Sequence, residues 1–383
     1  MMKKVLPLAI ATAMMSPFAA QADVKLSGTI QAEVGSVKDL NKVDAAGKQQ
    51  SRTVTDSDLT GNGSPNKLKL DISEKLGAGL EGFASMDWEF DTFENASNGT
   101  NANFINREKY VGIKGAFGHV KFGRIQGIYK TSTLGYDKWD STSLQALGTG
   151  AGMSSGAFGH GSFLDNVAEI GFNIPAGPAG SVKATVQYIG DQTPDATGAR
   201  MDGSMLGALQ LGSKDFEFSV VGAQQKNKDA SGKELNKATN WKVAGKYQLG
   251  GLYFALQYEK VKTAQAFGIP VAGTPITGTT TVTDPTEFVW GGLGYRMGNV
   301  ELFGWVGGVM KLKDIENNGI KVTDNKGDIM GYSVGAMYHF SKNMFAYAGY
   351  HKTDDKRTAD HTGAALNDKY DSEVFLGGLR LNF

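Results

Sequence analysis

Apolar and polar side chains alternate with a period of two along much of this chain, which is 383 residues long. Side chains alternate between the two faces of a strand, so this period predicts β-strands with one apolar and one polar face. In the first such segment, residues 23–36, the apolar face holds Val24, Leu26, Ile30, Ala32 and Val34, and the polar face holds Lys25, Ser27, Thr29, Gln31 and Glu33. The last segment, residues 370–383, alternates in the same way and ends on Phe383. One such strand alone also occurs at the edge of a soluble sandwich, which is the alternative interpretation.

Short glycine-rich turns and long polar segments separate the predicted strands in a regular order. The short turns lie near residues 76–79, 115–118, 175–180, 212–214, 250–251, 297–299 and 341–343. The long segments span residues 37–64, 93–104, 129–164, 190–203, 226–238, 263–284, 313–328 and 353–369. Seven short and eight long connections join sixteen strands. Short turns on one rim and long loops on the other are typical of outer-membrane barrels, so the pattern predicts an all-β, transmembrane, sixteen-stranded antiparallel β-barrel.

The N-terminus has the layout of a secretory signal peptide. Basic Lys3 and Lys4 precede an apolar run over residues 5–20, and Ala20-Gln21-Ala22 forms a small-residue cleavage site. The run is too short for a transmembrane anchor, which needs about 20 apolar residues. We therefore expect residues 1–22 to be a signal peptide and residues 23–383 to form one barrel domain.

The amino-acid composition limits the classes of function that the chain can have. Without Lys3 and Lys4, the mature chain would carry 37 basic and 39 acidic residues, a net charge of −2, which gives no support to nucleic-acid binding. The chain has no cysteine, hence no disulfide and no thiol chemistry. A mean hydropathy of −0.27 describes a polar chain, as expected when half of each strand faces a water-filled lumen.

Catalytic chemistry finds little support in the sequence. The five histidines are His119, His160, His339, His351 and His361, and no two of them have metal-ligand spacing. No Gly-x-Ser-x-Gly elbow occurs in a strand-to-helix context. We expect no catalytic residue, no metal site and no cofactor, and we expect His119 to lie in a solvated turn. A barrel enzyme of lipase or protease type remains an alternative.

Several segments, in order along the chain, carry a resemblance to a known family. They are residues 23–30, 73–80, 106–118, 122–124, 165–166, 338–343 and 379–383. In these segments the chain resembles the general porins of Gram-negative outer membranes, nearest the neisserial and β-proteobacterial branch. The resemblance implies a homotrimer with one water-filled pore per subunit, through which ions and small hydrophilic solutes diffuse passively. It also implies contact with outer-membrane lipid and lipopolysaccharide, and insertion by the barrel assembly machinery through the C-terminal strand. A substrate-selective outer-membrane channel is the main alternative.

The resemblance also implies a third long loop that folds into the lumen and narrows it. Carried over by position, the constriction comprises Lys67 and Arg124 on the wall, Asp137 and Asp140 on the loop, and Asp165 where the loop rejoins the wall. Strict alternation would put Arg124 on the lipid face, but Gly123 can relax the local pleat through a bulge, and the resemblance favours the lumen for Arg124. The family often has an arginine just before Asp165, but here that residue is Leu164.

Other residues are expected to line the lumen, close the barrel or mark its rims. The expected lumen wall includes Lys25, Gln31, Lys69, Glu81, Asp87, Glu89 and Arg380, and Phe383 is expected to close the barrel. Within the third loop, residues 137–143 are expected to form one short helical segment. Girdles of aromatic residues at the membrane interfaces would explain Tyr188, Tyr247, Tyr253, Tyr258, Trp290, Tyr295, Tyr332, Tyr338 and Tyr350.

Overall fold

The fold is seen in a computed structural model of the chain. It describes residues 22–43, 49–60, 65–93, 104–147, 153–154, 159–160, 163–190, 200–229, 231–262, 280–282, 286–311, 315–317, 320–322, 329–355 and 370–383. The signal peptide expected over residues 1–22 lies almost wholly outside these residues, as does His361.

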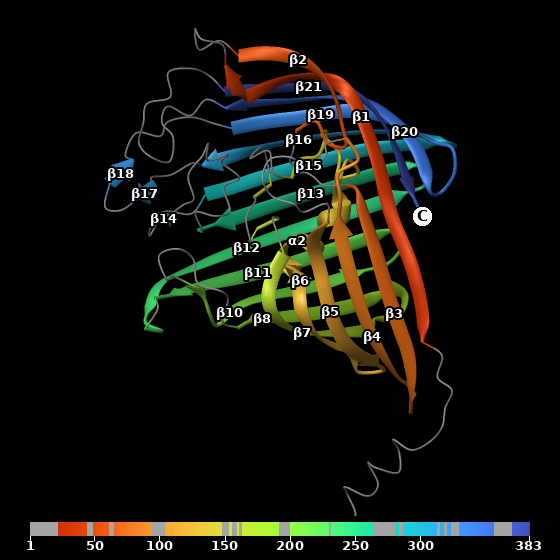
Figure 1. Ribbon diagram of the computed structural model, residues 1–383, viewed down its shortest axis with the longest axis vertical. Coiled ribbons are helices and arrows are strands. Elements are labelled where there is room, and N and C mark those ends of the chain that lie inside the picture. The colour runs from red at the N-terminus through yellow and green to blue at the C-terminus, as the bar shows by residue number, and fades with distance from the viewer. Residues whose placement is uncertain are drawn as a thin grey trace, which may run out of the picture.

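Sixteen long antiparallel strands form the wall of a closed barrel (Figure 1). They are β1 (Asp23–Val43), β3 (Lys67–Gly77), β4 (Leu80–Glu89), β5 (Ile105–Gly115), β6 (Gly118–Gln126), β7 (Phe163–Pro175), β8 (Ser181–Ile189), β10 (Ser204–Gly212), β11 (Phe216–Lys228), β12 (Glu234–Leu249), β13 (Leu252–Val261), β15 (Thr286–Met297), β16 (Val300–Lys311), β19 (Ile329–His339), β20 (Met344–Asp355) and β21 (Tyr370–Asn382). The predicted fold class and the number of strands are confirmed.

The barrel closes through its first and last strands. The first half of β1 pairs with β3, and its second half pairs with β21 in a register that runs from Thr29 opposite Asn382 to Lys38 opposite Glu373. Beyond Asn382, the N–H of Gly28 donates to the carbonyl of Phe383 at 2.9 Å, and the N–H of Phe383 donates to the carbonyl of Gly28 at 3.1 Å. Phe383 therefore belongs to the seam, as the sequence predicts.

The two faces of the wall differ as the alternation predicts. On β1, Val24 is 63 % exposed on the outer face, whereas Gln31 and Glu33 are 1 % exposed on the lumen face. Val111 on β5 is 61 % exposed and is also on the outer face. A band of exposed apolar side chains around a barrel is the surface that lipid covers. Among the described residues, no helix has both the length and the hydropathy needed to cross a membrane.

The two rims also differ. All seven predicted short turns are confirmed: they join β3 to β4, β5 to β6, β7 to β8, β10 to β11, β12 to β13, β15 to β16 and β19 to β20. At the first of them, Gly77 and Gly79 have φ values of +84° and +75°, a backbone region that favours glycine.

Two segments predicted as long loops are largely strand. In one, β1 continues to Val43 and pairs with an additional strand, β2 (Gln49–Asp56). In the other, β11 and β12 pair beyond Asn227 and Asn236, so the predicted loop over residues 226–238 is a hairpin with a turn at residues 229–233. Strand ends that project from the membrane face water on both sides, so they lack apolar residues although they are paired.

The other long connections add small elements at the same rim. The two-residue strand β9 (Arg200–Met201) pairs with β11. The strands β14 (Thr280–Val282), β17 (Ile315–Asn317) and β18 (Ile320–Val322) form a separate small sheet beyond the ends of the wall strands (Figure 1).

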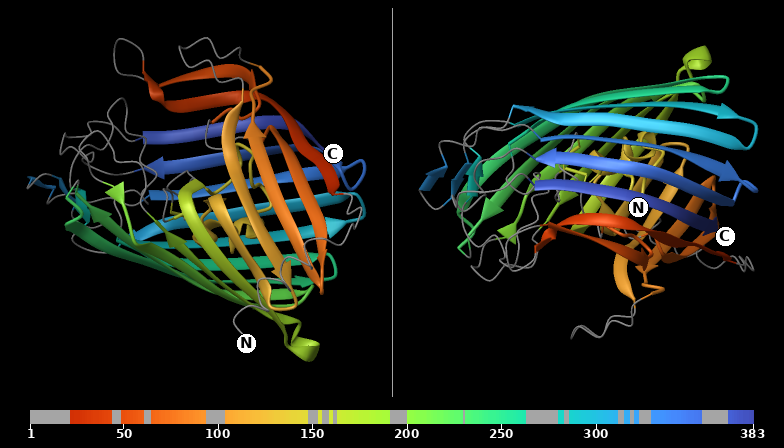
Figure 2. Two further views of the ribbon diagram at one scale, coloured as in Figure 1. Left: turned by 60° about the horizontal axis from the view of Figure 1, so that its bottom comes forward. Right: turned by 90° about the horizontal axis from the view of Figure 1, so that it is seen from above.

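The connection between β6 and β7, residues 127–162, is named here the lumen loop. It begins with the helix α2 (Ile128–Thr131) and the 3₁₀ turn η2 (Leu134–Tyr136), and α2 lies inside the ring of strands (Figure 2). A second 3₁₀ turn, η3 (Gly177–Ala179), forms the β7–β8 turn. Residues 137–143 form successive turns, so the helical segment expected there is wrong.

The aromatic residues divide between the two faces. Five of the expected girdle tyrosines are exposed: Tyr188, Tyr247, Tyr295, Tyr332 and Tyr338. Tyr253 and Trp290 are buried and pack in the hydrophobic cluster beneath the lumen loop, so their assignment to a girdle is wrong.

Candidate functional site

The lumen loop contacts the inner face of the wall from β8 round to β1. Three anchors hold it there: one apolar and two built around buried carboxylates. They decide which side of the lumen the loop occupies.

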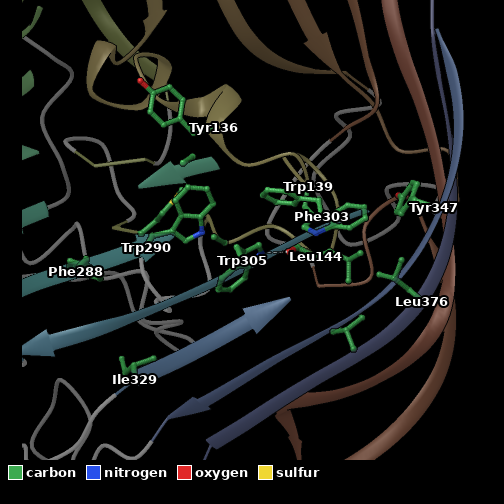
Figure 3. Packing of buried hydrophobic residues seen from close by; sticks show 14 of the residues in the cluster. Tyr136, Trp139, Leu144, Phe288, Trp290, Phe303, Trp305, Ile329, Tyr347 and Leu376 are labelled. Carbon is green, nitrogen blue, oxygen red and sulfur yellow. Dashed lines mark hydrogen bonds between the residues drawn. The ribbon is translucent and has the colours of Figure 1, made fainter. Parts of the chain in front are cut away.

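The apolar anchor joins the middle of the loop to β16 and β20 (Figure 3). The ring of Trp139 lies 6.1 Å from the Phe303 ring and 6.2 Å from the Tyr347 ring, measured between centroids. The indole N–H of Trp305 donates to the Leu144 carbonyl at 2.7 Å. All five side chains are buried. Each large buried side chain contributes about 1.5–3 kcal/mol, so this contact is a substantial part of loop docking.

The second anchor is Glu33 on β1. Its carboxylate accepts hydrogen bonds from the Ser143 N–H at 3.1 Å, the Leu59 N–H at 3.2 Å and the Tyr347 hydroxyl at 2.7 Å. The Ser143 hydroxyl also contacts this carboxylate and lies 2.7 Å from Asp58. Glu33 thus joins the lumen loop to the segment that follows β2.

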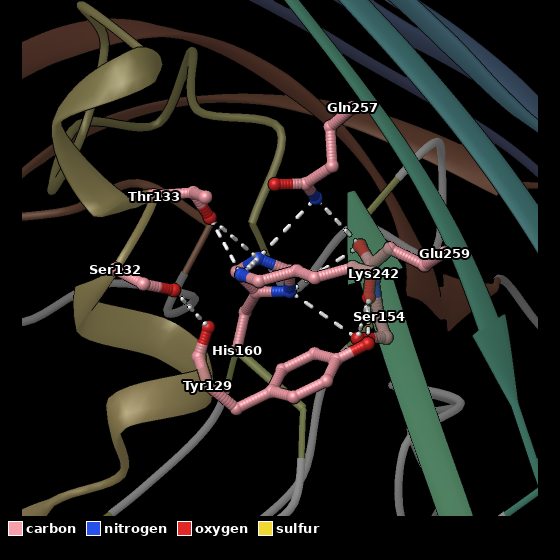
Figure 4. Close-up of polar contacts among 8 residues, drawn as sticks. All are labelled: Tyr129, Ser132, Thr133, Ser154, His160, Lys242, Gln257 and Glu259. Atoms are coloured by element: carbon pink, nitrogen blue, oxygen red, sulfur yellow. Dashed lines mark hydrogen bonds and ion pairs between the residues drawn. The ribbon is translucent and has the colours of Figure 1, made fainter. Parts of the chain in front are cut away.

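The third anchor is a buried charged network on β12 and β13 (Figure 4). Lys242 and Glu259 are both 0 % exposed. The Lys242 ammonium donates to Thr133 Oγ1 at 2.6 Å and to His160 Nε2 at 2.9 Å, and it lies 4.6 Å from the centre of the Tyr129 ring. These contacts tie the start and the end of the lumen loop to one lysine.

Glu259 completes the network. It accepts hydrogen bonds from the Ser154 hydroxyl at 2.6 Å, the Ser154 N–H at 3.2 Å and the Tyr129 hydroxyl at 3.1 Å. Because Nε2 of His160 accepts from an ammonium, the ring is neutral with its proton on Nδ1, 3.2 Å from Ser154 Oγ. Burial and the neighbouring Lys242 charge hold the pKa of His160 well below its usual value.

This network contains a serine, a histidine and an acid, but not in a catalytic arrangement. A catalytic histidine contacts the serine through one ring nitrogen and the acid through the other. Here Ser154 and Glu259 both approach Nδ1 of His160, at 3.2 and 3.4 Å, and Lys242 occupies the other nitrogen. Among the described residues, no group of three or more His, Cys, Asp or Glu side chains is placed to hold a metal ion.

Asp137 does not lie where we expected it. Its side chain is 4 % exposed, one oxygen accepts from the Trp139 N–H at 2.9 Å, and the other accepts from the Ala146 N–H at 2.7 Å. Burial raises the pKa of Asp137 to about 7, and the two amide bonds oppose this shift. The carboxylate is used to close the turn within the loop, so we remove Asp137 from the proposed constriction.

Asp140 faces the basic residues of the wall. Burial raises its pKa, and the positive charges of Lys130, Arg380 and Lys67 oppose the rise. Arg380 holds this part of the loop directly: its guanidinium donates to the carbonyls of Asp140 at 3.1 Å and Ser141 at 2.6 Å. Arg380 is therefore bound to this part of the loop, and Lys67 and Lys130 of α2 act on Asp140 through their charges; sequence analysis missed Lys130.

Arg124 and Asp165 form an ion pair at 2.6 Å beside the two ends of the lumen loop. Gly123 has a φ of +147°, and the β6–β7 register shifts between Gly123 and Ile125, as expected for a bulge. The guanidinium carbons of Arg124 and Arg107 lie 5.5 and 4.9 Å from the centre of the Phe163 ring. Arg124 thus pairs with Asp165 on the wall, and no contact between Arg124 and Asp140 of the loop is present among the described residues.

Arg107 is a functional candidate that sequence analysis missed. It pairs with Glu89 at 2.8 Å and with Asp87 at 3.4 Å, both of which were predicted to line the lumen. Three successive charges at residues 107–109 break the alternation of β5, and that break was the available signal of a bulge.

The remaining predicted residues lie as follows. Lys69 pairs with Asp71 at 3.0 Å and Glu81 pairs with Lys114 at 2.8 Å, and Lys25 lies on the face of β1 opposite Val24. Leu164, the departure from the family pattern, is buried against Ile125 and Tyr129.

The described histidines hold side-chain contacts. His119, expected in a solvated turn, lies on β6 and contacts Glu169 at 2.7 Å, so that expectation is wrong. His339 lies 3.1 Å from Glu301, and His351 lies 3.1 Å from Thr353. None of these contacts forms a triad.

A sixteen-stranded barrel with an inward-folded loop is the architecture of outer-membrane channel proteins. The chain matches the Gram-negative porin family over residues 8–358, and it belongs to that family. Membership places it in the outer membrane as a multi-pass β-barrel.

Individual relatives agree with this family. The chain is 30 % identical over 125 residues to the major outer membrane protein P.IB of Neisseria lactamica, covering 33 % of this chain and 34 % of that protein. It is 25 % identical over 240 residues to P.IB of Neisseria gonorrhoeae, covering 62 % and 53 %. The chain thus spans about a third to half of the length of these relatives.

Solved structures share the fold. An anion-selective porin from Comamonas acidovorans superposes with a TM-score of 0.66 at 20 % identity, covering 95 % of this chain and 100 % of that one. OmpT of Vibrio cholerae in its trimer form gives 0.57 at 14 % identity, covering 94 % and 99 %.

Proposed function

We propose that this protein is a passive diffusion channel for ions and small hydrophilic solutes. The observation that carries the proposal is the asymmetry of the lumen. The lumen loop is anchored to the wall from β11 to β1, where the lumen-facing side chains that it covers, such as Lys242, Glu259 and Trp305, are buried. On β3–β5 the lumen-facing Lys69, Asp71, Glu81 and Lys114 remain 29–49 % exposed. A charged, hydrated wall opposite a fixed loop is the geometry of a pore.

We propose further that the constriction lies between Lys67 on the wall and Asp140 and Lys130 on the loop, with Arg124 and Asp165 forming a second charged station beside it. Opposed charges in a narrow lumen produce a transverse field that acts on passing solutes. Charged rings of this kind set ion preference without a tight binding site.

The assembly is part of the same proposal. We expect cleavage of residues 1–22, a homotrimer in contact with lipid and lipopolysaccharide, and insertion by the barrel assembly machinery through β21. The exposed apolar band and the trimer form of a structural relative support this. The intact mass of the outer-membrane protein tests the cleavage, because a mass that includes residues 1–22 would contradict it.

Planar-bilayer recording of the purified protein tests the function. A trimeric diffusion channel should insert in discrete conductance steps, often in threes, and liposome swelling should follow solute size. Flux that saturates for one solute alone would favour the substrate-selective channel. Hydrolysis of phospholipid or peptide without conductance would favour the barrel enzyme, for which the buried Ser154–His160–Glu259 arrangement gives no support.

A further inference from the structure

A cavity of about 560 Å³ lies on the lumen wall at the rim of short turns, between the β3–β4 and β5–β6 turns and β7. The side chains that matter here are Glu81, Phe83, Tyr110, Lys114, Lys121 and Glu169. We name it the inner-wall pocket. Its volume falls within the range of small-molecule sites, about 300–1,000 Å³.

Two aromatic rings form one side of the pocket. Phe83 and Tyr110 meet edge to face, with centroids 6.1 Å apart and planes at 74°. The wall is shaped to hold them: a Cβ built on Gly112 would lie 2.7 Å from the Phe83 ring. Glycine at this lumen-facing position lets the ring lie against the strand, and it leaves the pair open to the cavity.

Charges of both signs surround the rings. The Lys114 ammonium lies 5.6 Å from the centre of the Phe83 ring and 2.8 Å from Glu81. The Lys121 ammonium lies 4.6 Å from the centre of the Tyr110 ring and 3.2 Å from Glu169. His119 contacts the same Glu169 at 2.7 Å. Each cation is therefore held between a carboxylate and an aromatic face.

This arrangement selects a particular solute chemistry. An anion that takes Lys114 leaves Glu81 without its partner, and a cation that takes Glu81 leaves Lys114 without its own. Leaving a charge unpaired costs little free energy at the half-exposed Glu81–Lys114 pair and more at the Lys121–Glu169 pair, whose side chains are 17 % and 6 % exposed. A solute that carries both an ammonium and a carboxylate can replace the internal pair at both ends. A planar ring on the same solute would contact Phe83 and Tyr110.

We propose that the inner-wall pocket is a transient binding site for small zwitterionic aromatic solutes of the free amino-acid type. This rests on the proposed diffusion channel, because a solute reaches the pocket through the lumen. Binding is weak, because a site along a conduction path must also release its occupant.

A second pocket in the same barrel provides a control for the role of the aromatic rings. A second cavity of about 440 Å³ at the same rim is lined by Lys183, Gln210 and Glu217 and by no aromatic residue. It resembles the inner-wall pocket in size and charge but lacks the rings. Lys183→Gln is thus matched to Lys114→Gln.

The test is single-channel current noise with phenylalanine, alanine or phenylacetate added to the bath. Phenylalanine should cause brief blockades, and alanine and phenylacetate should cause few. Lys114→Gln and Phe83→Leu should lower the association constant of phenylalanine that is calculated from the blockades. Lys183→Gln should leave this constant at the parent value. For Phe83→Leu we expect a fall of about 2- to 12-fold, which is the range of an aromatic contact of about 0.5–1.5 kcal/mol.

Equal blockade by phenylalanine and alanine would overturn the proposal, and so would equal blockade by phenylacetate. An equal effect of Lys183→Gln and Lys114→Gln would also overturn it. If Phe83→Leu fails to assemble, Tyr110→Leu tests the same ring pair. A protein that forms no conductance steps at all contradicts the proposed channel itself, and this outcome is distinct from a channel that conducts without blockade.

Discussion

Replacing Glu259 with glutamine should release the lumen loop from the wall and leave the barrel closed. In the parent protein this carboxylate is fully buried, accepts three hydrogen bonds from Tyr129 and Ser154, and shares a network with the Lys242 ammonium. Glutamine keeps the size of the side chain but removes its charge. Lys242 would then be a buried cation without a counter-ion.

The magnitude follows from that unpaired charge. Removing one partner of a buried ion pair costs about 3–5 kcal/mol. The β12–β13 pairing is held by a continuous backbone ladder, whereas side chains hold the loop, so the loop gives way first. A loss of 3–5 kcal/mol multiplies the ratio of undocked to docked loop by roughly 10² to 10³·⁵, since about 1.4 kcal/mol is a factor of ten.

The double variant Lys242→Met/Glu259→Gln separates charge from packing. It removes both ions, and replacing a buried pair by uncharged residues of similar volume is often close to neutral. We expect noisy, enlarged single-channel currents for Glu259→Gln and nearly parent currents for the double variant. Heat-modifiability of the barrel should be unchanged in both.

Parent-like currents for Glu259→Gln would refute the argument from the unpaired charge. So would a double variant with currents noisier than those of the single variant. Loss of the heat-modifiable barrel in Glu259→Gln would show that the network supports the wall and not only the loop.

Three further predictions concern titration, selectivity and closure. Between about pH 4 and 6.5, undocking of the lumen loop adds a proton to His160 and removes one from Asp137. Relative to the parent, His160→Gln should therefore strengthen docking as the pH falls and Asp137→Asn should weaken it, each by up to about 1.4 kcal/mol per pH unit. Current noise recorded as a function of pH measures this, and equal slopes in the two variants would contradict it. Arg124→Ala should move the reversal potential toward cations at low salt because the wall loses a positive charge beside Asp165, and adding Asp165→Asn should restore it; an unchanged potential would remove this pair from the pore. Phe383→Ala should lower the yield of heat-modifiable barrel because its ring packs over a glycine at the seam, and a normal yield would contradict that role.

Much of the fold was predictable because each residue of the wall faces either lipid outside the barrel or water inside it. Alternation on β1 therefore indicated both faces, and glycine at turns such as residues 77–79 marked the short connections. Alternation is lost at residues 226–238, where the strands leave the membrane. Beyond the lipid both faces meet water, so polarity no longer separates strand from loop.

The candidate site was less predictable because its organisation is non-local. Gly123 allowed the position of Arg124 to be anticipated, since a bulge leaves a mark within the strand. Glu33 and Glu259 gave no such mark, because their partners in the loop are 110 and 105 residues away in sequence. Asp137 was assigned to the constriction because alternation does not reveal the turn whose Trp139 and Ala146 amides its carboxylate accepts from.

The seam between β1 and β21 has a consequence for how the barrel forms. Thr29 and Asn382 are 353 residues apart, whereas the hairpins elsewhere join neighbouring strands. Loop-closure entropy grows only logarithmically, so closing the seam costs roughly 3 kcal/mol more than closing a twelve-residue hairpin. That difference places ring closure last, after the hairpins have formed. Because the ring of strands is closed, the termini can also be moved by circular permutation. Joining residues 23 and 383 through a short linker and opening the β11–β12 connection would give a permuted chain with the same wall. In that chain, the last pair to form would be β11 with β12.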